Sequence, residues 1–140
     1  MSSPSPVPAR PLIAVFNSSD DLVELLRILL EANGFVVVTG HIDDLRKGRL
    51  DLQSFVAQHQ PAAVLYDLVP PYDRHWAFVD HLRQTSALRD IPFVLTSTNA
   101  RMARELAGRS DHVIEVLGRP FDLEEILGAL RKAVEAAGRQ

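Results

Sequence analysis

A single carboxylate, Asp67, stands at the end of an apolar run and is the residue best placed to do chemistry. The run from Ala63 to Tyr66 is continuous, and Pro70 and Pro71 follow shortly after it. An apolar run bounded by chain breakers is typical of a buried strand in a parallel sheet. A charge on the last residue of such a strand lies at the carboxyl edge, where open α/β sheets bind ligands. Taken alone, the aspartate is more simply explained as a strand cap that starts a turn.

Other reactive side chains form no convincing site. His75 and His81 are six residues apart, whereas two metal ligands on one helix face need a spacing of four. The remaining histidines, at 41, 59 and 112, fall in different loops or element ends, so we expect all five on the solvated surface. The absence of cysteine excludes disulfides, thiolate metal sites and a cysteine nucleophile. No Gly-x-Ser-x-Gly nucleophile elbow occurs, and we expect the chain not to be an enzyme.

Five apolar runs alternate with helical patterns, and these elements must position Asp67. The runs predict strands over 12–16, 35–38, 63–67, 92–97 and 113–116. Apolar residues at helical spacing predict helices ending near 32, before 61, from 75 to about 86, over 100–107 and from 122 to about 137. From residue 40 to residue 60 the pattern of apolar residues is weaker, and a short helical turn is expected there. This alternation predicts right-handed crossovers and an α/β fold with a five-stranded, doubly wound parallel sheet.

Local signals mark both ends of the first helix. Ser18 and Asp21 form a pair that resembles a capping box, with Asp21 in place of the usual Glu or Gln. Asn33 and Gly34 form a typical helix end.

Length and composition favour one globular domain, over residues 11–138. The 140 residues are 46% hydrophobic and 24% charged, enough for one proper core. The net charge of −3 gives no basic face for nucleic acid, and no apolar run approaches the roughly 20 residues that span a membrane. Residues 1–10 lack the apolar segment of a signal peptide and are predicted to be a disordered leader. A cytoplasmic protein is therefore expected.

Three motifs in order resemble the receiver domain of bacterial two-component response regulators. They are YDLVPP around Asp67, RDIPFVLTS in the fourth strand, and GRPFDLEEIL before the last helix. Asp67 to Ser97 is 30 residues and Ser97 to Arg119 is 22, the intervals expected between acceptor aspartate, switch hydroxyl and conserved basic residue. The resemblance covers Pro11 to about Glu135 and implies the flavodoxin-like receiver fold. The chain is several residues longer than the family pattern between 40 and 60.

The resemblance implies roles for the matching positions. Asp67 would be the phosphoryl acceptor, Ser97 the hydroxyl that contacts the phosphoryl group, and Arg119 the basic residue where the family has lysine. Thr96 is a second, less favoured register for the hydroxyl. The family makes the peptide bond before Pro120 cis.

Other positions depart from the family pattern. Asn17 and Ser18 stand where the family has a pair of acids that hold Mg²⁺, and the carbonyl of Val69 would be a further metal ligand. Val116 stands where a switching aromatic residue is expected. Asp20 and Asp21 are candidates to rescue a metal site, although acids in the first turn of a helix are better explained by its dipole.

These departures weaken the metal chemistry. Mg²⁺ prefers carboxylate oxygens, and phosphoryl transfer to a carboxylate depends on positioning and charge neutralisation. Here the charges of Asp67 and Arg119 already cancel, so we expect a weak Mg²⁺ site, if any, at Asn17, Ser18, Asp67 and Val69. A guanidinium favours bidentate pairing with a carboxylate, which predicts a direct Asp67–Arg119 ion pair.

Three hypotheses follow. The first is a single-domain response-regulator receiver in phosphorelay signal transduction, degenerate at its acid pair, that acts through protein–protein contact with weak or no Mg²⁺-dependent phosphorylation at Asp67. The second is a functional phosphoacceptor that takes phosphate from a histidine kinase onto Asp67. The third is a flavodoxin-like cofactor binder, for which the NSSDD turn offers hydroxyls but no glycine.

The expected partner is a histidine kinase or another signalling protein. The helices at 100–107 and 122–137 carry mixed charges, which are most simply explained as a solvated face. The resemblance implies a homodimer through this face as a further hypothesis, because the family uses it for homodimers or output contacts. Neither nucleic acid nor a membrane is expected as a partner.

Overall fold

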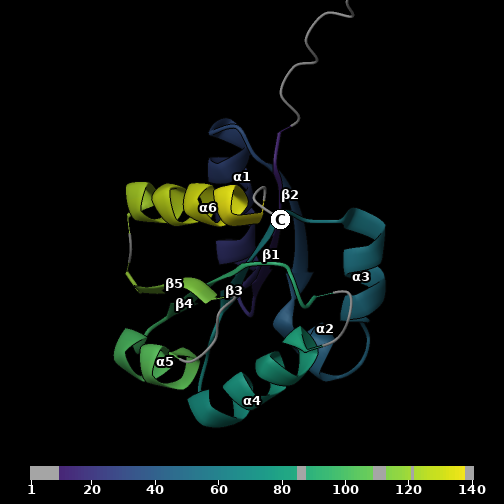
Figure 1. Ribbon diagram of the computed structural model, residues 1–140, viewed down its shortest axis with the longest axis vertical. Coiled ribbons are helices and arrows are strands. Elements are labelled where there is room, and N and C mark those ends of the chain that lie inside the picture. Colours follow the sequence, from purple (N-terminus) through teal and green to yellow (C-terminus); the bar gives the residue numbers. More distant parts are fainter. Residues whose placement is uncertain (1–9, 85–87, 109–112, 121, 138–140) are drawn as a thin grey trace, which may run out of the picture.

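One five-stranded parallel sheet forms the centre of the molecule, in the strand order β2-β1-β3-β4-β5 (Figure 1). The computed structural model describes residues 10–84, 88–108, 113–120 and 122–137. The strands are β1 (Leu12–Asn17), β2 (Val36–His41), β3 (Ala63–Asp67), β4 (Phe93–Ser97) and β5 (Val113–Gly118). The predicted α/β sheet is therefore confirmed. The predicted leader lies outside the described residues, except for Arg10.

Helices cover both faces of the sheet. They are α1 (Asp20–Ala32), α2 (Ile42–Arg46), α3 (Leu52–His59), α4 (Tyr72–Arg83), α5 (Ala100–Ala107) and α6 (Leu123–Ala137). Helices α1 and α6 contribute Leu30 and Ile126 to the hydrophobic core on one face. Helices α2 to α5 pack on the other face, as Figure 1 shows from the edge of the sheet. The short α2 corresponds to the helical turn predicted after residue 40.

Side chains alternate between the two cores along each strand, as expected for β-structure. Val64 and Tyr66 of β3 belong to the core under α2 to α5, whereas Ala63 and Leu65 belong to the core under α1 and α6. By the same alternation, Asp67 lies on the α1 and α6 face at the carboxyl end of its strand.

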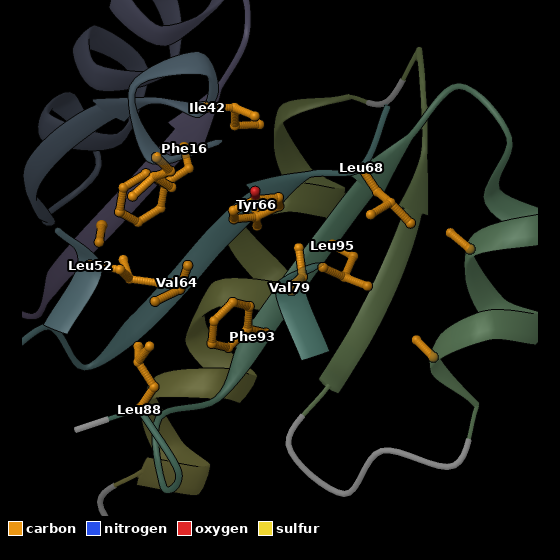
Figure 2. Packing of buried hydrophobic residues seen from close by; sticks show 14 of the residues in the cluster. Phe16, Ile42, Leu52, Val64, Tyr66, Leu68, Val79, Leu88, Phe93 and Leu95 are labelled. Carbon is orange, nitrogen blue, oxygen red and sulfur yellow. The ribbon is translucent and has the colours of Figure 1, made fainter. Parts of the chain in front are cut away.

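Three aromatic rings from neighbouring strands form the centre of the larger core. Phe16, Tyr66 and Phe93 lie along the sheet in Figure 2, with centroid distances of 6.0 Å from Phe16 to Tyr66 and 6.5 Å from Tyr66 to Phe93. All three are almost completely buried. Offset aromatic contacts of this kind add to the stabilisation that burial provides. The rings therefore fix how β1, β3 and β4 lie against the helices below.

Several element boundaries differ from the sequence-based expectation. Strand β2 starts one residue later than predicted and continues through Gly40 to His41, because Gly40 lets the chain pass directly over the ring of Phe16. A Cβ atom at Gly40 would lie 2.5 Å from that ring. Helix α4 begins at Tyr72, three residues before the predicted start at His75. Its predicted end at residue 86 lies outside the described residues.

The first helix is capped one residue later than predicted. The hydroxyl of Ser19, not Ser18, accepts a hydrogen bond from the backbone N–H of Leu22. At the other end, Asn33 caps the helix and Gly34 adopts a φ of 95°, as the Asn-Gly pair predicted.

Candidate functional site

Four polar side chains meet at the carboxyl edge of the sheet on its α1 and α6 side. Asp67 pairs in register with Thr96, and Phe16 pairs with Tyr66, so that Asn17 follows at the end of the neighbouring strand. The backbone N–H of Arg119 donates to the carbonyl of Ser97, which brings the residue after β5 to the same edge. The crossovers of a parallel sheet thus gather residues that are far apart in sequence.

Asp67 is the buried acid of this edge, with 1% of its surface exposed. Its Oδ1 accepts a hydrogen bond of 2.6 Å from the Thr96 hydroxyl and lies 3.5 Å from Nε of Arg119. Within the described part of the chain, Oδ2 has no hydrogen-bond partner. The carboxylate is therefore held through one oxygen only.

The predicted ion pair between Asp67 and Arg119 is confirmed, but it is not bidentate. Nε of Arg119 lies 3.5 Å from Oδ1 of Asp67, and within the described residues Nε makes no hydrogen bond. The guanidinium side chain is 28% exposed and can reach solvent with its other nitrogens. The pair therefore supplies charge compensation rather than the directed fork of a bidentate contact.

Burial governs the ionisation of Asp67. Loss of hydration raises the pKa of this carboxyl above its ordinary value, and this effect outweighs the Thr96 hydrogen bond and the charge of Arg119, which both lower it.

The hydroxyl that contacts Asp67 belongs to Thr96, the less favoured of the two predicted registers. Ser97 is completely buried, and its Oγ accepts a hydrogen bond of 3.1 Å from the backbone N–H of Asn99. Successive side chains of a strand point to opposite faces, so only Thr96 shares the face of Asp67. The role of Ser97 toward a phosphoryl group stays a prediction.

The two acids that follow β1, Asp20 and Asp21, are exposed. The side-chain oxygen of Asn17 accepts a hydrogen bond from the backbone N–H of Ser19, and Ser18 is exposed. Asp20, whose side chain is 91% exposed, lies 3.6 Å from Nε2 of His41. Helix capping by Ser19 also accounts for a hydroxyl of the NSSDD turn without a cofactor. Among the residues that the structure describes, no three acids, histidines or cysteines gather to hold a metal ion.

A buried histidine supports the loop that follows Asp67. His75 of α4 is 4% exposed, and its Nδ1 accepts a 3.0 Å hydrogen bond from the N–H of Val69 while lying 3.2 Å from the Val69 carbonyl. Its Nε2 lies 3.0 Å from the hydroxyl of Tyr66. The expectation that all histidines lie on the surface is wrong for His75, which lies one helical turn before the buried Val79 and therefore faces the core. His112 lies outside the described residues.

Burial shifts the pKa of both His75 and Tyr66. Burial lowers the pKa of His75, which favours the neutral imidazole. Burial likewise raises the pKa of the Tyr66 hydroxyl. A neutral histidine can accept from Val69 with Nδ1 and donate to Tyr66 with Nε2, so one tautomer satisfies both contacts.

The donor set does not fit a Mg²⁺ ion. Asp67 is its single carboxylate, and Arg119 already compensates that charge. Asn17 and Ser18 offer neutral oxygens only, and the Val69 carbonyl lies against His75. Because Mg²⁺ dehydrates reluctantly and binds through carboxylates, this set lacks the charge that would replace its hydration shell.

The remaining predicted positions surround this site. Val116 is buried in the core under α2 to α5, and its carbonyl accepts a hydrogen bond from Arg104. The peptide bond between Arg119 and Pro120 is cis, as the resemblance implied. Tyr72, at the start of α4, shares a 2.8 Å hydrogen bond with the hydroxyl of Thr98, which connects the loops after β3 and β4.

Thr96 was predicted only as the less favoured position for the hydroxyl, and the contact between His75 and Tyr66 was not predicted from the sequence. The strand alternation was available as a signal for Thr96, since an aligned neighbour of Asp67 must share its face. For His75, the spacing of four residues to Val79 was a signal that its ring faces the core, whereas its contact with Tyr66 could be seen only in the structure.

The strand order, the two helix layers and the aspartate at the end of β3 are those of response-regulator receiver domains. Solved structures bear out this resemblance. A sensor protein from Polaromonas sp. JS666 is 28% identical, with a TM-score of 0.74 over 91% of this chain and 98% of that one. The chemotaxis protein CheY4 of Vibrio cholerae is 17% identical, with a TM-score of 0.70 over 89% of this chain and 99% of that one.

One curated relative agrees with this result. The chain is 26% identical over 129 residues to the DNA-binding dual master transcriptional regulator RpaA of Synechocystis sp., a match that covers 92% of this chain and 51% of RpaA. The chain thus spans about half the length of that relative. No family model matches the sequence. None of the helices in the described residues has the length and apolarity required to cross a membrane.

Proposed function

We propose that this chain is a receiver module of two-component signalling that works through protein–protein contact, without Mg²⁺-dependent phosphorylation of Asp67 and without enzymatic activity. One observation carries the proposal: Asp67 is buried, its charge is compensated by Arg119, and no three acids, histidines or cysteines gather among the described residues to hold a metal ion. In a site that is already neutral, a divalent cation would add uncompensated charge to a buried environment. Such a charge is costly unless it is paired.

An apolar groove supports protein contact as the working mode. It lies between α1 and α6, beside Arg119, and Leu25, Leu29, Pro120 and Leu123 line it. Leu25 is 51% exposed, and Ile28 of the same helix is 56% exposed. Both helices carry acids in their first turns, so the groove is flanked by negative charge. A histidine kinase or another signalling protein that presents an apolar helix with basic neighbours would complement this surface.

The homodimer hypothesis concerns a different surface. Helices α5 and α6 carry ion pairs within the chain, Arg101 with Glu105 at 3.5 Å and Lys132 of α6 with Glu115 of β5 at 3.8 Å. Sedimentation velocity over a range of concentrations tests this hypothesis, since a homodimer would dissociate on dilution.

A second candidate function has one observation in its favour. Oδ2 of Asp67 has no hydrogen-bond partner among the described residues and is thus chemically available to accept a phosphoryl group from a histidine kinase. This candidate needs a donor that neutralises charge without a metal, or a rearrangement that opens the site.

The test is a titration with Mg²⁺ and beryllofluoride that follows the fluorescence of Trp76, which packs against the core under α2 to α5. We expect no saturable response from the wild-type protein. The double variant Asn17→Asp/Ser18→Asp serves as the matched control, because it restores two acids beside Asp67 and should gain Mg²⁺ binding. A saturable, millimolar-range response of the wild-type protein would contradict the proposal.

A further inference from the structure

Both groups that hold Asp67 contact the same oxygen and come from different strands. Thr96 is the penultimate residue of β4, and Arg119 follows the end of β5. Through Oδ1 the carboxylate therefore connects the ends of β3, β4 and β5. This connection is made entirely by groups of the protein.

Backbone hydrogen bonds run beside the side-chain contacts at this edge. The N–H of Leu68 donates to the carbonyl of Thr96 at 2.7 Å, and the N–H of Arg119 donates to the carbonyl of Ser97 at 2.8 Å. These two amides lie directly beyond the ends of β3 and β5. The rate at which these two amide hydrogens exchange with solvent therefore reports whether the ends of β3, β4 and β5 stay packed together.

Among the described residues, the Thr96 hydroxyl is the one group that donates a hydrogen bond to the Asp67 carboxylate. Without it, both carboxylate oxygens would lack a hydrogen bond in a site that is 1% exposed. A buried carboxylate cannot remain unsatisfied without a large cost, so the edge would have to admit water.

We propose that Thr96 is a latch, whose hydroxyl holds Asp67 beside Arg119 and keeps the ends of β3, β4 and β5 in one closed arrangement with no group bound. The inference rests on the proposed function, since it names how that same site is regulated. A receiver latched in this way presents its surface to partners in a single state. Loss of the latch, rather than arrival of a phosphoryl group, would then change that surface.

The test is amide hydrogen exchange followed by NMR in metal-free buffer. Thr96→Val removes the hydroxyl at nearly constant volume, and Thr96→Ser retains it. Thr98→Val is the matched control, because Thr98 is an exposed neighbour whose hydroxyl bonds to Tyr72 instead. In Thr96→Val we expect the amides of Leu68 and Arg119 to exchange about tenfold faster or more, with wild-type rates in the other two variants.

Two results would overturn the latch. One is exchange within about twofold of wild type at both amides in Thr96→Val. The other is an equal acceleration at the mid-strand amide of Leu65, which would indicate global destabilisation. Thr96→Ala replaces Thr96→Val if the latter does not fold. Because this measurement uses no metal or phosphate mimic, its failure is distinct from failure of the proposed function, which depends on the Mg²⁺ and beryllofluoride titration.

Discussion

At the scale of single residues, opposing effects meet on the Asp67 carboxyl. Burial favours its neutral form, whereas the hydrogen bond from Thr96 and the charge of Arg119 favour the carboxylate. The pKa is raised, so burial has the larger effect. The lost hydration of Asp67 therefore outweighs the stabilisation of its charged form by Thr96 and Arg119.

This balance predicts the direction of a pH effect in Asp67→Asn. Because the pKa of Asp67 is raised on folding, the neutral carboxyl contributes stability that is fully present below the unfolded value of about 3.9 and is lost as the pH rises through the folded pKa. We expect the free energy of unfolding of wild type, minus that of Asp67→Asn, to fall as the pH rises above about 4 and then to level off. Urea unfolding of both proteins across the pH range measures this difference.

The opposite slope would contradict this account. If the difference grew with pH, the ion pair with Arg119 and the Thr96 hydrogen bond would outweigh burial. Asp67 would then be a stabilising charge of the ordinary, salt-bridged kind.

At the scale of elements, α4 is attached to the loop after β3 by one side chain. His75 contacts the backbone of Val69 and the hydroxyl of Tyr66, both from the segment that carries Asp67. The ring of Tyr66 also lies edge-on to His75 at a centroid distance of 5.4 Å. The loop geometry beside Asp67 therefore depends on the packing of α4.

His75→Phe is expected to destabilise the protein markedly. Phenylalanine can fill the space of the ring, but it leaves the Val69 N–H and the Tyr66 hydroxyl without a partner. Each buried, unsatisfied group costs about 1–3 kcal/mol, so we expect the two together to lower the free energy of unfolding by about 2–6 kcal/mol. The control is His81→Phe, at an exposed position of the same helix. Equal stabilities of the two variants in urea would show that the hydrogen bonds contribute nothing.

The same histidine predicts a loss of stability in mild acid. Its pKa is lowered on folding, so the unfolded chain binds a proton first, and stability is lost as the pH falls below about 6.5 toward the folded pKa. The wild-type free energy of unfolding should therefore decline over this range more steeply than that of His75→Phe. Parallel pH profiles for the two proteins would contradict the assignment.

The pattern of apolar residues in the sequence was enough to predict the fold. Most of the contacts between side chains could be identified only in the structure. The apolar runs at β1, β3 and β4 were correctly predicted because strands buried on both faces leave a continuous apolar signal. The early start of α4 was missed, although Asp73 in its first turn is a residue that favours a helix start. The burial of His75 does not depend on this shift, because His75 and Val79 are four residues apart and share one helix face.

Within the site, the position of Asp67 in the sheet was predicted better than the side chains that contact it. The apolar run that ends at Asp67 correctly placed this residue at the carboxyl edge, and its pairing with Arg119 followed from the preference of a guanidinium for a carboxylate. The choice between Ser97 and Thr96 depended on strand register, which an interval counted along the chain does not determine.

At the scale of the whole molecule, the sheet separates two hydrophobic cores. Ile42 of α2 is fully buried on one face, and Ile126 of α6 is 1% exposed on the other. The two residues belong to different clusters and share no core neighbours among those described. Changes on one face should therefore reach the other only through the sheet.

Ile42→Val and Ile126→Val test this independence with identical chemistry. Each should lower the free energy of unfolding by about 0.5–1.5 kcal/mol. The double variant should lose the sum of the two within about 0.5 kcal/mol, as expected for distant sites. Chemical denaturation of the four proteins measures the coupling. A coupling energy well above that limit would mean that the sheet transmits packing changes between its faces.

We propose that Asp67 keeps the acceptor position of a receiver but not its metal-dependent chemistry. Intact-protein mass spectrometry after incubation with acetyl phosphate and Mg²⁺ tests this claim most directly. We predict no added phosphoryl group on the wild-type chain under conditions in which Asn17→Asp/Ser18→Asp becomes modified. A wild-type chain that gains one phosphoryl group, and loses this ability in Asp67→Asn, would contradict the claim.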